Sequence, residues 1–145
     1  MSTRRLAIIA VSTAMVAALI AVIPIPIPAT GGYTHPGAVA EVFIALAFGP
    51  VVGMVAAGLG AATADLLLGY ASFAPLSLVA HAALGFLVGL LAWKKPGWAM
   101  FVGWVAGGLA LVAVYFTGEA FIYNLGIPVA LAETPANGFQ VALGI

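Results

Sequence analysis

Long uncharged stretches separate the few charged positions of this sequence. No charged residue occurs within residues 6–40, 42–64, 66–93 or 96–118, and apolar side chains dominate each stretch. A helix that crosses a membrane needs roughly 20 mainly apolar residues. The pattern therefore predicts a series of membrane-spanning helices.

Prolines and glycines set the expected ends of these helices. We expect helices over 6–23, 36–48, 51–68, 75–93 and 98–116, and a sixth from near residue 135. The run PIPIP at 24–28 should be extended and polyproline-like, because each proline disfavours helix in the residue before it. A helix over 135–145 would be about 16 Å long against a hydrocarbon core of about 30 Å, so the last helix is expected to be incomplete or re-entrant.

Composition agrees with a membrane location. The chain is 65% hydrophobic and 6% charged, with a mean hydropathy of +1.25, and it lacks the polar surface that a soluble domain of this size needs. We therefore predict an all-α, polytopic membrane helical bundle of five to six transmembrane helices, forming one transmembrane domain over 1–145. The chain has no cysteine, so it has neither disulfides nor thiolate metal ligands.

The basic residues predict the orientation. They form two pairs, at 4–5 and 94–95, with four expected helices between them. A cytoplasmic N-terminus would place both pairs inside, as the positive-inside rule favours. All acidic residues then lie toward the outer side: Glu41, Asp65, Glu119 and Glu133.

Placing an ionisable side chain within a membrane span costs free energy, so such residues suggest a function. Asp65 lies near the end of its predicted helix, and His81 lies about one and a half turns into the next one, so the two side chains could pair. Such a pair would either hold a polar substrate or lock two helices together. Glu41 lies one turn into its helix, where a charge at the membrane interface is the simpler explanation.

Small residues recur at four-residue spacing. Glycine pairs occur at 49 and 53, 85 and 89, and 103 and 107, and the first helix carries Ala10, Ala14 and Ala18. This spacing lets helix backbones approach closely in lipid. We expect packing within the molecule for the glycine pairs, and an external docking stripe is the sharper hypothesis for the alanines.

Signatures of common enzymes and motors are missing. The sequence has no G-x-x-x-x-G-K-[ST] loop, no H-E-x-x-H and no G-x-S-x-G. We predict a protein that is not an enzyme, with no catalytic residues, no cofactor and no metal site. The two basic pairs do not form a nucleic-acid patch.

Four segments together give the sequence a family resemblance. GGYTHPG (31–37), ALAFGPVVGMVAAGLGAATADLLLGYASFAP (45–75), LVAHAALGFLVGLLA (78–92) and ETPANGFQVALG (133–144) resemble the substrate-binding S components of energy-coupling factor (ECF) transporters. The strongest elements are FGPVVG, ATADLLLGY and PANGFQ, in this order and spacing.

The resemblance implies a multi-pass receptor for a vitamin or related micronutrient in a prokaryotic cell membrane. Its pocket would lie near the outer face under the loop PIPIPATGGYTHPG. Its partners would be a transmembrane coupling protein, docked on Ala10, Ala14 and Ala18, and two ABC ATPases. The pocket candidates are Tyr33, His35, Glu41, Asp65, Tyr70, His81, Asn124, Asn137 and Gln140. This mixture suits a neutral or mildly cationic heteroaromatic ligand.

Two departures leave the substrate open. Related members often carry an aspartate where this chain has Ala38, and a lysine near the position of His81. Two other classes of function stay as alternatives. A membrane scaffold would use its polar residues only to pin helices, and a small oligomeric carrier would need polar residues along the whole depth of a span.

Overall fold

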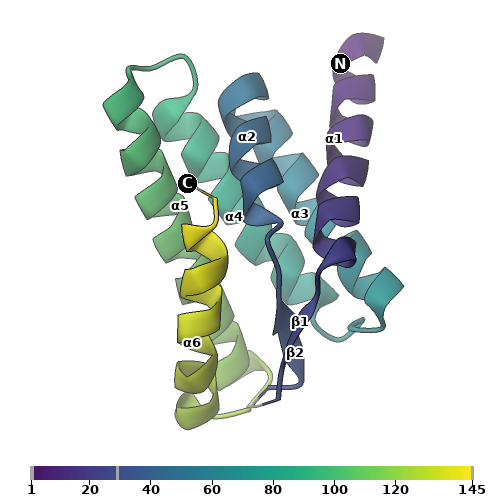
Figure 1. The fold of residues 1–145 in the computed structure, drawn as a ribbon, viewed down its shortest axis with the longest axis vertical. Coiled ribbons are helices and arrows are strands. Elements are labelled where there is room, and N and C mark those ends of the chain that lie inside the picture. The colour runs from purple at the N-terminus through teal and green to yellow at the C-terminus, as the bar shows by residue number, and fades with distance from the viewer. Residues whose placement is uncertain (1, 29, 145) are drawn as a thin grey trace.

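Six α-helices, one short π-helix and one short hairpin make up the computed structural model, which describes residues 2–28 and 30–144 (Figure 1). In chain order the elements are α1 (Thr3–Val22), β1 (Ile25–Ile27), β2 (Gly32–Thr34), α2 (Ala38–Phe48), α3 (Pro50–Leu68), α4 (Ala74–Ala92), α5 (Gly97–Thr117), the π-helix η1 (Gly118–Ile122) and α6 (Ile127–Ala142). Four segments are long and apolar enough to cross a membrane: α1, α3, α4, and α5 with η1. The predicted all-α polytopic bundle is confirmed.

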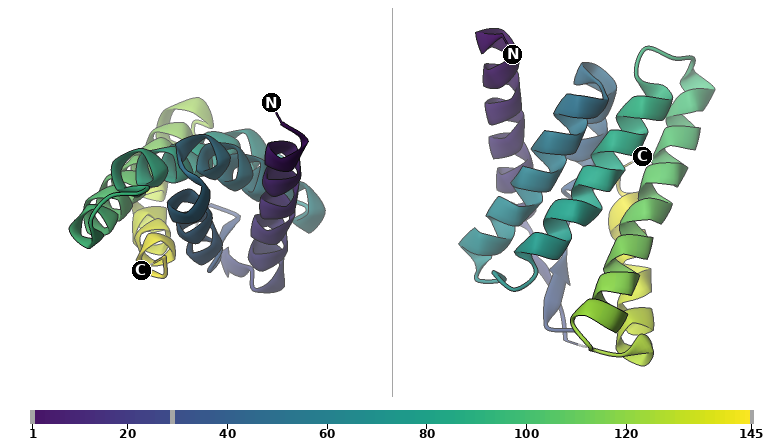
Figure 2. Two further views of the ribbon diagram at one scale, coloured as in Figure 1. Left: turned by 90° about the horizontal axis from the view of Figure 1, so that it is seen from above. Right: turned by 180° about the vertical axis from the view of Figure 1, so that it is seen from behind.

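Close glycine contacts hold the central helices together. A Cβ added at Gly53 of α3 would lie 2.7 Å from the carbonyl oxygen of Gly85 on α4. One added at Gly107 of α5 would lie 2.9 Å from the carbonyl oxygen of Leu84. The glycine pairs therefore serve packing within the molecule, as expected. Figure 2 shows α3, α4 and α5 side by side, with α1 next to α3.

Glycine also makes the sharp connection between α2 and α3. Gly49 has φ +86°, and Pro50 opens α3 at its first turn, where a proline fits well. The ring of Trp93 packs over Gly49, 2.8 Å from where a Cβ would lie. The end of α2 is thereby fixed against the end of α4.

The proline-rich run differs from its expected form. Ile25 to Ile27 form β1, which pairs antiparallel with β2 in the register Ile25 to Thr34 and Ile27 to Gly32. Prolines are tolerated in a short edge strand, where no second partner strand needs their missing N–H. The connection from α1 to α2 is thus a hairpin folded back on itself, not a polyproline spacer.

The last helix begins earlier than predicted. It starts at Ile127, after Gly126 with φ +87° and with a proline in its first turn, and Pro135 lies inside it. The helix has 16 residues, which corresponds to about 24 Å. One face of α6 buries Ala130, Glu133, Asn137 and Gln140, and this packing compensates for the hydrogen bond that Pro135 cannot donate.

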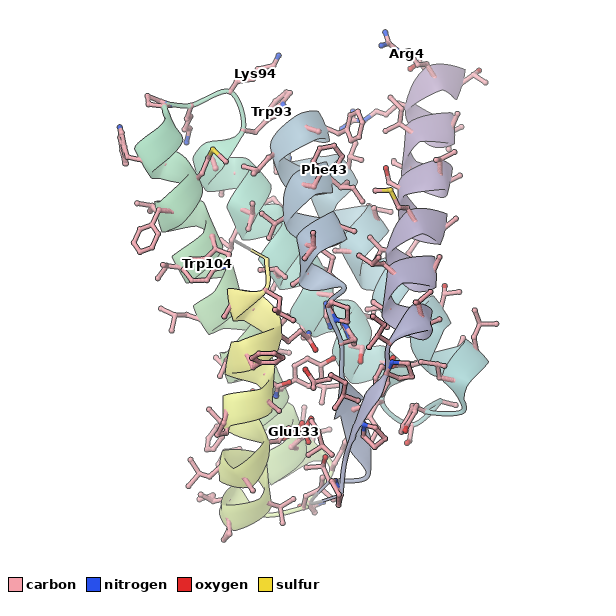
Figure 3. The ribbon with its side chains drawn as sticks, in the orientation of Figure 1. Arg4, Phe43, Trp93, Lys94, Trp104 and Glu133 are labelled. Atoms are coloured by element: carbon pink, nitrogen blue, oxygen red, sulfur yellow. The ribbon has the colours of Figure 1, made fainter. Side chains whose placement is uncertain are left out.

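The two ends of the bundle differ in charge. Figure 3 shows Arg4 and Lys94 at one end and Glu133 toward the opposite end. This separation agrees with a membrane orientation in which the basic end is cytoplasmic and the acidic end faces outward.

Candidate functional site

Polar and aromatic side chains gather beneath the hairpin at the outer end of the bundle. The hairpin places Tyr33 there, and its hydroxyl donates to Asp65 Oδ1 on α3 at 2.7 Å. The Tyr33 ring lies 4.5 Å from that of Tyr70, centroid to centroid. Burial and the hydrogen bond to Asp65 raise the pKa of Tyr33, so the phenol keeps its proton and acts as a donor.

His81 of α4 pairs with Glu41 of α2. The Nδ1 of His81 lies 2.8 Å from Glu41 Oε1 and 2.9 Å from Oε2, and both side chains are fully buried. On its other side, His81 Nε2 lies 3.5 Å from the amide nitrogen of Gln140 on α6. Glu41 is therefore a partner in the interior and not a charge at the interface.

The Asp65–His81 pair expected from the sequence is not formed. Asp65 instead accepts a hydrogen bond from Tyr33 of the hairpin, and His81 contacts Glu41 because α2 packs against α4. Both groups thus have a nearer partner from a segment that the spacing of two adjacent helices does not reveal.

His35 follows β2 and is a neutral base. Its Nδ1 accepts a hydrogen bond from the Gly37 amide at 3.1 Å, which requires an unprotonated nitrogen. Its ring stacks on His81 at 5.4 Å. Burial, together with the nearby His81, lowers the pKa of His35 well below its usual range.

Further hydrogen bonds connect the elements that surround the cluster. Thr34 Oγ1 donates to the Ala136 carbonyl at 3.2 Å and lies 3.3 Å from Gln140 Oε1. Tyr115 of α5 donates to Ser77 Oγ of α4 at 2.8 Å. These contacts tie the hairpin to α6 and α5 to α4, so four elements share one polar interior.

The acidic residues Glu119 and Glu133 also reach this interior, and the sequence analysis did not select them for the site. They come from η1 and α6, are 0% and 2% exposed, and approach each other closely. A usable signal existed in the spacing 130, 133, 137 and 140, which places Glu133 on the same helix face as Asn137 and Gln140. The expectation of a helix start near residue 135 hid that spacing.

A small cavity lies at the centre of the cluster. It is lined by Gly32, Tyr33, His35, Asp65, Phe73, Ser77, Tyr115 and Glu133. Its volume open to a water-sized sphere is about 10 Å³, which is near the limit for one water molecule. Pockets for small organic ligands measure roughly 300–1,000 Å³, so the hairpin or its neighbours must move outward before such a ligand fits.

The structure brings together most, but not all, of the candidates selected from the sequence. Seven share the contacts described above: Tyr33, His35, Glu41, Asp65, Tyr70, His81 and Gln140. Asn137 is buried on the same face of α6. Asn124 is exposed, with φ +53°, and does not line the cavity. Among residues 2–28 and 30–144, no group of three His, Asp or Glu side chains is arranged to hold a metal ion.

Comparison with known proteins identifies the family. Residues 1–145 match the family described as "ECF-type riboflavin transporter, S component". The chain belongs to this family. It is therefore an S component of an ECF-type importer and a multi-pass protein of the plasma membrane. An uncharacterised protein of Pyrococcus woesei is 37% identical over 110 residues, covering 73% of this chain and 72% of that protein.

Proposed function

We propose that this S component captures a neutral heteroaromatic vitamin from the outer side of the membrane, and riboflavin is the first candidate. The observation that carries the proposal is the polar and aromatic interior beneath the hairpin, built by Tyr33, His35, Asp65 and His81. The family description supports riboflavin in particular.

The chemistry of the cluster suits such a ligand. Tyr33, Tyr70 and His35 offer ring faces for stacking, and Gln140 offers both a donor and an acceptor for the edge of a heterocycle. Phe73 also lines the cavity, and its ring lies edge-on to that of Tyr123 at 5.7 Å. An apolar wall with a few fixed polar groups is the usual make-up of a small-molecule site.

Binding should involve movement of the hairpin. The two strands of the hairpin pair with each other, and Thr34 of β2 donates to the Ala136 carbonyl of α6, so one hydrogen-bonded segment covers the cavity. Displacing it exposes Tyr33 and His35 together, since both are on or next to β2.

Riboflavin binding can be tested directly with the purified full-length chain in detergent. Stacking on aromatic rings should quench flavin fluorescence in a saturable, stoichiometric titration. Tyr33→Ala should weaken binding at least about 10-fold, because it removes both a stacking surface and the partner of Asp65. Ser72→Ala, an exposed position outside the cavity, serves as the matched control.

Two outcomes would count against this function. Mass spectrometry of small molecules retained by gently purified protein should detect a vitamin-like compound. If a folded preparation retains no small molecule and binds no vitamin in titrations, the result would favour the alternative that the protein is a membrane scaffold. If Tyr33→Ala binds riboflavin as tightly as the unsubstituted chain does, the ligand lies elsewhere.

The proposed partners are a transmembrane coupling protein and two ABC ATPases, which would supply the energy that this chain cannot. Ala10, Ala14 and Ala18 all remain exposed on one face of α1, as a docking stripe requires. We expect Ala14→Leu to abolish co-purification with the coupling protein without changing vitamin binding. Leu109→Phe, which adds bulk to an exposed position of α5, should leave co-purification intact.

A further inference from the structure

Several buried carboxylate oxygens at the outer end have no hydrogen-bond partner among the described residues. They are Asp65 Oδ2, Glu133 Oε2 and both oxygens of Glu119. The three residues are 2%, 2% and 0% exposed. Burying a carboxyl oxygen without a hydrogen-bond partner is costly, so the presence of such oxygens on three residues at one end of the bundle needs a reason other than packing.

Two of these residues line the cavity of the candidate site and come from different helices. Asp65 comes from α3 and Glu133 from α6, and both line the cavity beside Tyr33. Glu133 Oε1 also lies 3.5 Å from where a Cβ on Gly32 would be, so the hairpin closes directly over it. Glu119 stands behind Glu133 on the π-helix, an irregular turn that is frequent at functional sites.

No basic side chain compensates these carboxylates. All four lysines and arginines of the chain, Arg4, Arg5, Lys94 and Lys95, lie in the α1 start and the α4–α5 turn, at the opposite end (Figure 3). Of the two histidines, His81 is taken by Glu41 and His35 uses its ring nitrogen to accept from Gly37. A ligand in this cavity therefore meets carboxyl oxygens that are free to accept, and no lysine or arginine.

We propose that Asp65 and Glu133, backed by Glu119, determine specificity by admitting vitamins that present hydrogen-bond donors or a positive charge and by rejecting phosphorylated and carboxylated ones. The inference rests on the proposed function and narrows its ligand class. Ligand hydroxyl, amino or protonated ring groups would satisfy the free oxygens, whereas a phosphate would meet acceptor oxygens and no balancing cation in a poorly solvated site.

The test uses three vitamins, each paired with its own phosphate ester: riboflavin with riboflavin 5′-phosphate, thiamine with thiamine monophosphate, and pyridoxine with pyridoxine 5′-phosphate. Dissociation constants are measured by equilibrium dialysis with the purified full-length chain at physiological salt. For whichever vitamin binds most tightly, the ester should bind at least about 100-fold more weakly.

Substitutions should then show that Asp65 and Glu133 cause the weaker binding of the phosphate ester. In the double variant Asp65→Asn with Glu133→Gln, the ester should bind at most about 10-fold more weakly than the vitamin, mainly because the affinity for the ester rises. If the double variant does not fold, Glu133→Gln alone gives the same readout. Ser72→Lys adds one positive charge at an exposed outer position that does not line the cavity, and should leave the ratio of the two dissociation constants unchanged.

The outcomes separate the inference from the function beneath it. Equal binding of a vitamin and its ester would overturn the inference and leave the receptor function standing. The same would follow from an unchanged ratio in the folded double variant. A folded chain that binds none of the vitamins would overturn the proposed function, and the inference with it.

Discussion

At the scale of single residues, the outer end of the bundle is organised by specific pairs of buried polar groups. Glu41 contacts His81 Nδ1, and Tyr33 donates to Asp65, each pair joining two different elements. Polar groups that are buried in this way are expensive to separate, because the remaining partner loses both water and its hydrogen bond. The pairs therefore restrict how the helices and the hairpin can be arranged.

A double-mutant cycle should show that His81 is coupled to Glu41 more strongly than to Asp65. Glu41→Gln or His81→Gln alone should cost about 3 kcal/mol of unfolding free energy, since each leaves the other group buried without its partner. The two changes together should cost less than their sum by about 1–3 kcal/mol. Thermal or denaturant unfolding in detergent measures this. A larger coupling for Asp65→Asn with His81→Gln would contradict the observed pairing.

His35 should make the folded chain less stable at low pH. Its pKa is lowered in the folded state by burial and by His81, whereas in the unfolded chain it returns to about 6.5. The unfolded state therefore binds the extra proton first, and stability is lost as the pH falls below about 6.5. Between pH 7.5 and 5.5 the chain should lose about 1 kcal/mol more than the variant His35→Asn.

Asparagine is the suitable replacement because its side-chain oxygen can still accept from the Gly37 amide two residues on, yet it does not titrate. Unfolding curves at the two pH values provide the measurement. Equal pH dependence of the two proteins would show that His35 is protonated as easily in the fold as outside it.

At the scale of secondary-structure elements, backbone contact between helices depends on glycine at defined positions. Gly53→Ala should destabilise the chain by about 1–3 kcal/mol, because the new Cβ would lie 2.7 Å from the Gly85 carbonyl oxygen and push α3 away from α4. Gly138→Ala is the matched control. No atom lies within 4 Å of a Cβ there, and alanine favours helix by about 0.5–1 kcal/mol. Loss of stability in both variants would mean that the close approach is not what glycine provides.

The elements also show where the sequence was informative. The long helices follow from uninterrupted apolar runs ended by glycine or proline, and α3 and α4 were predicted to within one residue at each end. The hairpin was missed because alternating proline and isoleucine signals extension but not the partner, which is the segment Gly32–Thr34. The start of α6 was missed because Pro135 resembles a first-turn proline, while tertiary packing of Glu133 and Gln140 carries the helix through it.

The same distinction applies to the candidate site. The choice of residues such as Tyr33 and Gln140 as candidates came from the family resemblance, through the segments GGYTHPG and PANGFQ that contain them. The sequence did not predict which of these side chains pair with each other, because Glu41 contacts His81 only when α2 packs against α4. Distances between non-adjacent elements are a property of the assembled bundle and not of any single helix.

At the scale of the whole molecule, the two ends of the bundle differ in the sign of their charged residues. Lysine and arginine occupy the end formed by the start of α1 and the α4–α5 turn, and every acid lies in the other half. Retaining the basic end in the cytoplasm places the acidic interior and its hairpin toward the outside, where a nutrient is captured.

This orientation can be tested by chemical labelling, because the chain contains no cysteine and any introduced one is unique. Ser72→Cys, exposed in the turn between α3 and α4, should react with a membrane-impermeant maleimide on intact cells. Lys95→Cys, exposed in the turn between α4 and α5, should react only after the cells are opened. The two positions flank one helix, so opposite labelling establishes that α4 crosses the membrane and fixes its direction. The reverse pattern would place the candidate site on the cytoplasmic face, where it could not receive an external vitamin, and would contradict both the positive-inside assignment and the proposed receptor function.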